Sequence, residues 1–363
     1  MKKEIIFVTG ALSGGGAERV ISILANGCAE LGHSVEVVVL RNKQTVYPIS
    51  EKVKVVQLPS YEHFTTIRRI WKLHSILKAS SAQTIIPFLQ IITIYTLLAN
   101  IGLGKNIVTS VRADPNMTLV NSSLKDRTAN FLMRKIGFIH LTNWVVFQTP
   151  EAQICYPKSI QQKSSIIPNP LDTSRLPERF EGEREKRIIA AGRFSEEKNF
   201  PMLLRAFAAF HKEFPAYRLE LCGEGALRGE YEAMLAQLGV ADAVEMPGFV
   251  SNLAGRMRTA AMFISTSNHE GISNSMLEAL GMGVPTIVTD CPVGGARMFV
   301  KNGENGVLIP MEDEQALLDG MRRIASDPGF AEAISRNAVK IREELAAEKI
   351  CQQWLGVVER ITQ

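Results

Sequence analysis

Apolar runs alternate with segments of helical periodicity along the first forty residues of the chain. The pattern predicts a strand at 5–9, an amphipathic helix at 17–31 and a second strand at 35–40. Gly32 suits the end of this helix, because glycine adopts the left-handed backbone conformation without a steric penalty. Two strands joined by a crossover helix form a parallel βαβ unit, so the chain is predicted to begin as a Rossmann-like sheet.

The alternation continues through the first half of the chain and then starts again. Further strand-like runs of near-continuous apolar character lie at 53–57, 84–88, 107–111, 144–148 and 165–167. The proline-rich stretch 168–172 and the charged segment 178–187 interrupt the pattern, which is typical of an interdomain linker. A second set of strands is predicted at 187–191, 218–222, 243–246, 262–266 and 285–289. The helices predicted among them lie near 199–213, 228–238, 253–258, 274–282 and 314–324.

A final predicted helix at 347–361 has no strand after it, so it could return to the first domain. We therefore predict an α/β protein with Rossmann-like domains at 1–168 and 169–346, and a C-terminal helix at 347–363 that packs on the first. The length of 363 residues fits two domains, because single hydrophobic cores stop growing near about 250 to 300 residues. Apolar residues make up 46% of the chain, which excludes a disordered protein.

Cysteine usage and the N-terminus both bear on the compartment. The five cysteines lie far apart, without the paired spacing of a zinc site or a redox dithiol. The apolar run after Met1-Lys2-Lys3-Glu4 is too short for the core of a signal peptide. Both features favour a cytoplasmic protein whose thiols are buried and reduced.

Charge is distributed unevenly along the chain. Residues 1–180 hold 21 Lys and Arg against 11 Asp and Glu, whereas the remainder holds 20 against 26. The basic half could serve anionic substrates, phosphate head groups or a membrane surface, or could reflect only solvated lysines. Within it, the helix-like segment 66–78 interleaves apolar residues with Arg and Lys. This segment is either a peripheral contact with an anionic inner membrane face or an ordinary half-buried helix.

The segment 79–104 contains no charged residue and therefore has to be weighed as a membrane span. Pro87 interrupts it, and polar residues such as Gln83, Gln90 and Asn100 are spread along it. The segment is better explained by a buried strand followed by a helix.

Candidate chemistry is expected at strand-to-helix turns, where helix N-termini point backbone N–H groups at ligands. Gly14-Gly15-Gly16 opens the first helix, and Gly15 and Gly16 would let a ligand approach the backbone. The glycine spacing is not G-x-G-x-x-G, and Arg41-Asn42 replaces the acid that would bind a nicotinamide dinucleotide ribose. No G-x-x-x-x-G-K-[S/T] occurs either. The sequence therefore disfavours both of these nucleotide-binding modes.

A more specific pattern lies between Ser267 and Pro285. Glu270 falls in a polar loop after a predicted strand, and Glu278 lies eight positions on, about one turn into the next helix. One carboxylate could accept hydrogen bonds from sugar hydroxyls and the other from a ribose. The backbone amides of 272–275 could hold a diphosphate between them.

The frame S-x-x-E-G-x-x-x-x-x-x-E-A-x-x-x-G-x-P resembles the signature of the family 4 retaining glycosyltransferases of the GT-B fold, also called glycosyl transferases group 1. Every framework position from Ser267 to Pro285 matches. The resemblance covers almost the whole chain and is weakest between residues 45 and 165. It also takes in Gly14 to Val20, Gly192-Arg193, Lys198-Asn199, Gly223-Glu224-Gly225 and Asn302 to Gly306. It implies two Rossmann-like domains that face each other across a cleft holding the donor.

The resemblance also implies roles for single residues. Glu270 would contact the donor sugar, and Arg193 and Lys198 the diphosphate, so these three are the expected catalytic residues. The expected donor-binding residues are Gly15, Gly16, Glu278, Gly271, Ile272, Ser273, Asn274, Val250 and Glu224. Where several family members place a histidine in the first domain, this chain has Arg112, which could meet an anionic acceptor or the diphosphate. With Arg193 and Lys198 on the diphosphate, the resemblance implies that no metal and no cofactor are required, which is consistent with the absence of a D-x-D pair.

The expected activity is a retaining, metal-independent transfer of a hexose or N-acetylhexosamine from a nucleotide diphosphate sugar, with UDP as the leaving group. The expected acceptor is a saccharide, in particular one linked to a lipid for cell-surface polysaccharide biosynthesis, and no nucleic acid is expected as a partner. A nucleotide-sugar epimerase of the same architecture is the alternative enzyme. A non-catalytic sugar-nucleotide binding protein is a third possibility, which the intact two-glutamate frame disfavours.

Overall fold

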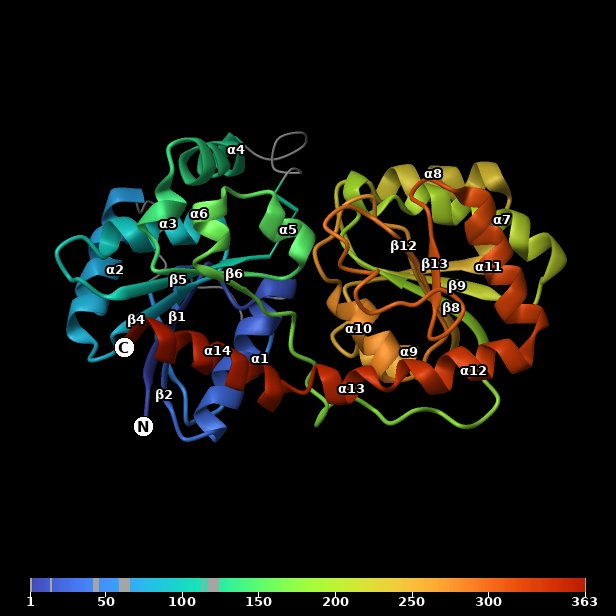
Figure 1. The fold of residues 1–363 in the computed structure, drawn as a ribbon. Helices are drawn as coiled ribbons and strands as arrows, with labels where there is room; N and C mark the ends of the chain where they lie inside the picture. Colours follow the sequence, from blue (N-terminus) through green and yellow to red (C-terminus); the bar gives the residue numbers. More distant parts are fainter. Residues whose placement is uncertain are drawn as a thin grey trace. The chain divides into compact units, whose positions relative to one another are not determined.

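The computed structural model describes residues 2–13, 15–41, 46–58, 66–112, 114–115 and 124–362, except for the side chains of Lys125 and Asp126. The chain forms two compact units, and Figure 1 shows the elements of each. Unit 1 consists of Met1–Pro170 and Leu345–Gln363, and unit 2 of Leu171–Glu344. Each contains one sheet in which all paired strands are parallel, so the predicted pair of Rossmann-like domains is confirmed.

The sheet of unit 1 has seven strands in the order β3-β2-β1-β4-β5-β6-β7. These strands are β1 Glu4–Thr9, β2 Ser34–Val39, β3 Lys54–Gln57, β4 Thr84–Pro87, β5 Asn106–Val111, β6 Trp144–Phe147 and β7 Ser164–Ile166. The helices of this unit are α1 Gly16–Glu30, α2 Thr66–Ala79, α3 Gln90–Ala99, α4 Leu124–Asn130, η2 Phe131–Lys135, η3 Phe138–Leu141, α5 Pro150–Ile154, α6 Lys158–Gln161 and α14 Ala347–Thr362. The uncharged segment 79–104 thus forms β4 and α3. No helix in the described part of the chain has both the length and the hydropathy of a membrane span.

Helices cover both faces of this sheet, because successive side chains of a strand point to opposite sides. On β1, Ile6 and Val8 join a core with residues of α2 and α3. Phe7 belongs to the other face, where its ring lies 6.4 Å from that of Phe88. The Phe88 ring in turn stacks on Trp354 of α14 at 6.0 Å. The strand is therefore buried on both sides, which explains its continuous apolar run.

The C-terminal helix α14 packs against α1, and Figure 1 shows the two helices crossing. Gly27 of α1 permits this approach, because a Cβ there would lie 2.5 Å from the Sγ of Cys351. The Cys351 thiol and burial together raise the pKa of the Cys28 thiol above its usual range, so this thiol stays protonated at neutral pH. All five cysteines are free, and four are buried as predicted, whereas Cys155 is half-buried.

The sheet of unit 2 has six strands in the order β10-β9-β8-β11-β12-β13. These strands are β8 Glu185–Ala191, β9 Arg218–Cys222, β10 Val244–Gly248, β11 Ala260–Ser265, β12 Thr286–Thr289 and β13 Val307–Ile309. The helices are η4 Glu196–Lys198, α7 Phe200–Glu213, α8 Arg228–Leu238, η5 Ala241–Ala243, α9 Leu253–Met257, α10 Asn274–Gly281, α11 Glu314–Ser326, α12 Pro328–Ala338 and α13 Ile341–Glu344. The sequence pattern had predicted neither β13 nor α12.

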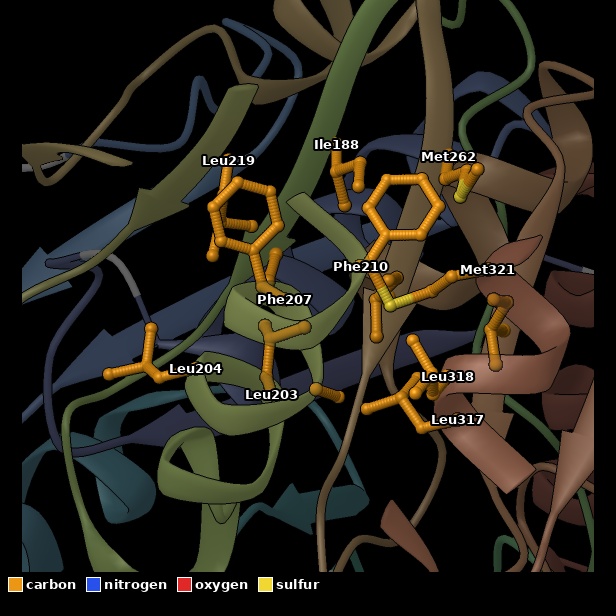
Figure 2. Packing of buried hydrophobic residues seen from close by; sticks show 14 of the residues in the cluster. Ile188, Leu203, Leu204, Phe207, Phe210, Leu219, Met262, Leu317, Leu318 and Met321 are labelled. Carbon is orange, nitrogen blue, oxygen red and sulfur yellow. The ribbon is translucent and has the colours of Figure 1, made fainter. Parts of the chain in front are cut away.

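The core of unit 2 lies where α7 and α11 pack on the sheet. Figure 2 shows Phe207 and Phe210 of α7 beside Met321 of α11, with Ile188 and Leu219 from the strands. All of these side chains are buried, and each contributes roughly 1.5 to 3 kcal/mol by leaving water. The strands that contribute to this core lead into the loops at the carboxyl edge of the sheet.

Candidate active site

The strand order of unit 2 reverses between β8 and β11, which are neighbours in the sheet although β9 and β10 separate them in the chain. Ligands of open parallel sheets bind beyond the carboxyl ends of the strands at such a switch point. The loop after β8 carries Arg193 and Lys198, and the loop after β11 carries Glu270. The two motifs are far apart in the sequence, but their loops begin at the ends of neighbouring strands.

Lys198 and Glu270 form an ion pair between Nζ and Oε2. Their side chains are 18% and 26% exposed, so the pair is partly shielded from water but still open to a ligand. The hydroxyl of Ser267 also lies 3.5 Å from the same carboxylate oxygen. Because the charges are partly desolvated, their field is stronger than that of a fully exposed pair.

Two asparagines and a threonine hold the loops around this ion pair together. Asn199 donates from Nδ2 to the Oδ1 of Asn268 at 3.1 Å. The Thr266 hydroxyl donates to the Lys198 carbonyl at 2.9 Å, and the Asn268 amide donates to the Glu197 carbonyl at 2.9 Å. These bonds fix the backbone on both sides of Lys198, so the direction of its side chain is set by the fold. The sequence analysis had assigned no role to Asn268.

Unusual backbone conformations gather around the same loops. Asn199, Val293 and Glu312 have φ of 44°, 63° and 58°, a region that residues other than glycine rarely adopt. Asn268 donates to the Glu312 carboxylate at 3.2 Å, which links Glu312 to the Lys198 loop. Such conformations persist where the surrounding structure over-determines them, and functional sites are frequent examples.

Glycines let three further loop segments come close together. A Cβ on Gly295 would lie 1.7 Å from the carbonyl oxygen of Gly271, and one on Gly223 would lie 1.8 Å from that of Gly192. A Cβ on Gly225 would lie 2.2 Å from the carbonyl oxygen of Phe194. The Gly223-Glu224-Gly225 motif therefore has a packing role against the Arg193 loop. Sequence reasoning missed Gly295, although the Gly294-Gly295 doublet was a usable signal.

Helix α10 begins beside Glu270 and contains Glu278. The hydroxyl of Ser273 caps the helix by accepting from the Met276 amide at 3.4 Å. Gly271, Ile272 and Ser273 are buried, and Asn274 is half-buried. Glu278 is the fifth residue of the helix and only 3% exposed. The structure thus places the two glutamates of the frame before and within one helix, as the spacing predicted.

The remaining predicted residues of unit 2 are not bonded to the Lys198–Glu270 pair in the part of the chain that the structure describes. Arg193 is exposed, and its guanidinium forms no ion pair with a described residue. Glu224 pairs with Arg228 at 2.6 Å. Val250 is half-buried and lines a polar pocket of about 630 Å³, whose other walls include Arg187 and Arg256.

In unit 1, the predicted glycines stand at the start of α1. Gly15 is the N-cap of this helix, and Gly16 is its first residue. The Gly15 amide donates to the carboxylate of Glu18 at 3.0 Å, so this N–H already has an acceptor within the chain. Gly14 lies outside the described residues.

Arg112 follows β5 at the carboxyl edge of the unit 1 sheet. Its Nε donates to the Ser110 hydroxyl at 2.6 Å, and its Nη1 donates to the Asn169 side chain at 3.0 Å. The guanidinium carbon lies 5.3 Å from the ring centroids of both Phe88 and Trp354. Its Nη2 is buried and has no hydrogen-bond partner among the described residues. Burial lowers the pKa of Arg112 to about 9, so the group is a cation at neutral pH.

Comparison with known proteins decides the family. The family model Glycosyltransferase Family 4 matches residues 14–175, and the model Glycosyl transferases group 1 matches residues 175–341. The chain belongs to glycosyltransferase family 4. It is 25% identical, over 99% of both chains, to a Campylobacter jejuni GalNAc-alpha-(1->4)-GalNAc-alpha-(1->3)-diNAcBac-PP-undecaprenol alpha-1,4-N-acetyl-D-galactosaminyltransferase.

Solved structures confirm the GT-B fold of this glycosyltransferase. Sucrose-phosphate synthase from Thermosynechococcus elongatus superposes with a TM-score of 0.85 at 18% identity, over 99% of both chains. Anabaena HepE, solved in complex with UDP and glucose, superposes with a TM-score of 0.82 at 17% identity, over 99% of this chain and 100% of HepE. None of the three proteins named here is an epimerase, so the epimerase alternative is not favoured.

Proposed function

We propose that this glycosyltransferase transfers a hexose or N-acetylhexosamine from a UDP-sugar to a hydroxyl of a lipid-linked saccharide, with retention of configuration and without a metal. The observation that carries the proposal is the Lys198–Glu270 ion pair at the switch point of unit 2. The pair supports the proposal because it lies at the edge where open parallel sheets bind their ligands. There Lys198 would meet the diphosphate, and Glu270 would meet the sugar hydroxyls.

The reaction breaks the bond between the anomeric carbon and a diphosphate oxygen, so negative charge grows on the leaving diphosphate. Lys198 and Arg193 would stabilise this charge more in the transition state than in the ground state. Glu270 would accept hydrogen bonds from the sugar hydroxyls and hold the Lys198 ammonium in position. The pair thus joins sugar recognition to leaving-group stabilisation.

The nucleotide would lie along the start of α10. The first backbone amides of a helix lack intrahelical acceptors and favour an anion, so the segment Gly271 to Asn274 suits the diphosphate. Glu278 would accept from the ribose hydroxyls. Val250 would border the base, and Glu224 would reach the nucleotide only by exchanging its ion pair with Arg228.

The acceptor would meet unit 1. The Campylobacter relative acts on a saccharide attached to undecaprenol through a diphosphate, which supports an acceptor of this class in polysaccharide or glycan biosynthesis. Arg112 would meet a phosphate group of this acceptor, because it is a cation whose Nη2 has no hydrogen-bond partner among the described residues. Gly15 and Gly16 would contact the donor from the start of α1. The basic helix α2 supports a peripheral position on an anionic cytoplasmic membrane face.

The test is incubation of the full chain with a panel of radiolabelled nucleotide sugars and undecaprenyl-diphosphate saccharides. Transfer releases nucleoside diphosphate and a longer glycan, whereas epimerisation releases a new sugar nucleotide. We expect UDP and a glycan with the same anomeric configuration as the donor, and undiminished product in the presence of EDTA. A panel that produces neither UDP nor a lengthened glycan would remove the proposal.

A further inference from the structure

The guanidinium of Arg112 is bonded only to neutral acceptors among the described residues. These acceptors are the Ser110 hydroxyl at 2.6 Å, the Ile167 carbonyl at 3.3 Å and the Asn169 side chain at 3.0 Å. Gln148 donates to the same oxygen of Asn169 at 2.7 Å, and both amide side chains are buried. The bonds use the N–H groups of Nε and Nη1, so the two donors of Nη2 are left for a ligand.

Two aromatic rings from distant segments pack on this guanidinium. Its carbon lies 5.3 Å from the ring centroid of Phe88, directly after β4, and 5.3 Å from that of Trp354 on α14. The two rings also stack on each other, with centroids 6.0 Å apart and an interplanar angle of 25°. Both side chains are buried. The attraction between the cation and the ring faces is therefore strong, because water is excluded from it.

The indole of Trp354 is not held in place by a hydrogen bond. Its Nε1 is buried and has no hydrogen-bond partner among the described residues. A buried donor without an acceptor lowers stability, so packing alone would favour an apolar side chain without this N–H. Tryptophan is, however, the side chain whose ring face attracts a cation most strongly. The unpartnered N–H therefore favours a role for the ring face rather than for the indole nitrogen.

We propose that Phe88 and Trp354 are positioning residues for Arg112, and that they hold its guanidinium with Nη2 free for a phosphate of the acceptor. An arginine side chain has many rotamers, and ordering it during binding weakens affinity. A guanidinium that is held by two rings and three hydrogen bonds has lost this freedom before the acceptor binds. The inference rests on the acceptor role proposed for Arg112, and it makes the C-terminal helix part of the acceptor site.

Acceptor kinetics in a double-mutant cycle test this inference. Trp354→Met removes the aromatic face and leaves an adaptable apolar side chain in its place. KM for an undecaprenyl-diphosphate saccharide should rise about fivefold, with kcat and the donor KM unchanged, because one desolvated cation–π contact is lost. Trp354→Phe keeps an aromatic face and should remain within about twofold of wild type. In the Arg112→Gln background, Trp354→Met should have no further effect, because the cation that the ring positions is gone.

Trp144→Met is the matched control. Trp144 of β6 also packs on an arginine of α14, since the guanidinium carbon of Arg360 lies 5.0 Å from its ring centroid. The control thus removes a tryptophan that contacts the same helix but packs on a different arginine. Phe88→Leu is a second test of the contact with Arg112 and should also raise the acceptor KM. Thermal unfolding followed by circular dichroism shows which variants are folded, and Phe88→Leu takes the place of Trp354→Met in the cycle if the latter is not.

Three results would overturn the inference. The first is an equal rise in the acceptor KM in Trp354→Met and Trp144→Met, which would assign the effect to the docking of α14. The second is an undiminished effect of Trp354→Met in the Arg112→Gln background. The third is a Trp354→Phe variant that loses as much as Trp354→Met, because an aromatic face would then not be what matters.

A binding measurement separates this inference from the proposed transfer. Calorimetry with inorganic pyrophosphate, in the presence of saturating UDP, requires no turnover. We expect the affinity to fall in Arg112→Gln and in Trp354→Met, and to be retained in Trp354→Phe and Trp144→Met. This order of affinities in a protein that transfers no sugar would contradict the proposed function alone. Equal affinities in wild type and Trp354→Met, with transfer intact, would contradict the positioning role alone.

Discussion

The two units share one topology but differ in charge and surface. Unit 1 holds 21 Lys and Arg against 11 Asp and Glu, a net charge of +10, whereas unit 2 holds 20 against 26, a net charge of −6. Among the described residues, thirteen of the sixteen exposed large hydrophobic side chains belong to unit 1, and only Phe249, Met298 and Met311 to unit 2. Unit 1 is therefore cationic and exposes many large apolar side chains, whereas unit 2 is acidic and exposes few.

The proposed diphosphate site lies in the unit with the negative net charge, so net charge by itself would not indicate it. The acidic unit carries Arg193 and Lys198 in the loop after β8, and the loop after the neighbouring β11 carries Glu270. In the basic unit, the cations discussed above lie on helix α2 and, with Arg112, at the end of β5. A small phosphorylated ligand needs a few cations close together, whereas a large anionic surface is attracted by cations distributed along a helix. The predictions below test this division of roles.

The largest effect is expected at the switch point of unit 2. Lys198→Ala should lower kcat roughly 100-fold, because it removes a cation aimed at the developing charge of the diphosphate. Arg193→Ala should have a similar effect. Turnover with a UDP-sugar is the measurement. Lys212→Ala is the control, since this exposed lysine of the same unit lies at the far end of α7. Near-normal turnover in both active-site variants would remove these residues from the site.

A smaller and more selective effect is expected at Arg112 of unit 1. Arg112→Lys should raise KM about tenfold for a diphosphate-linked acceptor, because a charge-assisted hydrogen bond is lost. KM for the donor and for the same saccharide without its diphosphate should not change. An equal rise in KM for the acceptors with and without the diphosphate would show that the variant disturbs packing rather than phosphate recognition.

The same residue predicts a pH dependence. Burial lowers the pKa of Arg112 to about 9, so its charge is present below that pH and is lost as the pH rises through it. KM for the diphosphate-linked acceptor should therefore stay constant near neutral pH and increase above about pH 9. Steady-state rates across this range are the measurement, and Arg112→Gln should show no such rise.

A modest effect is expected on α2. Lys72→Ser should weaken binding to phosphatidylglycerol vesicles about fivefold, since each basic residue near an anionic surface contributes about 1 kcal/mol. High salt should produce a similar loss in wild type. Lys212→Ser on unit 2 serves as the charge-matched control. If Lys72→Ser and Lys212→Ser weaken vesicle binding equally, the attraction to the vesicle depends on the total charge of the protein and not on α2.

The smallest effect concerns thiol reactivity. Burial raises the pKa of the Cys291 thiol to about 12, and burial also raises the pKa of Cys222, so these groups are protonated and unreactive at neutral pH. Cys28 and Cys351 are buried between α1 and α14. Native titration with Ellman's reagent should therefore detect about one fast thiol, and Cys155→Ser should abolish it. Fast reaction of Cys28 or Cys351 as well would show that α14 opens readily.

The strand and helix positions could be predicted because parallel strands buried on both faces are continuous apolar runs. The β1 run is an example, since Phe7 faces one core and Ile6 the other. The three-residue β13 was not predicted, although β7 is equally short and was predicted within 165–167, so short runs give an uneven signal. The Glu270 and Glu278 frame was visible because both residues belong to one continuous motif.

The amino-acid sequence by itself determined the order of elements, the two-domain organisation and the residue types of the candidate site. These depend on local periodicity and on short motifs. The tertiary structure alone decided that Lys198 meets Glu270, 72 residues away, and that Trp354 lies against Arg112. The reason is that strand order and helix docking depend on hydrogen bonds and packing between distant segments, and local periodicity carries no record of which segments become neighbours.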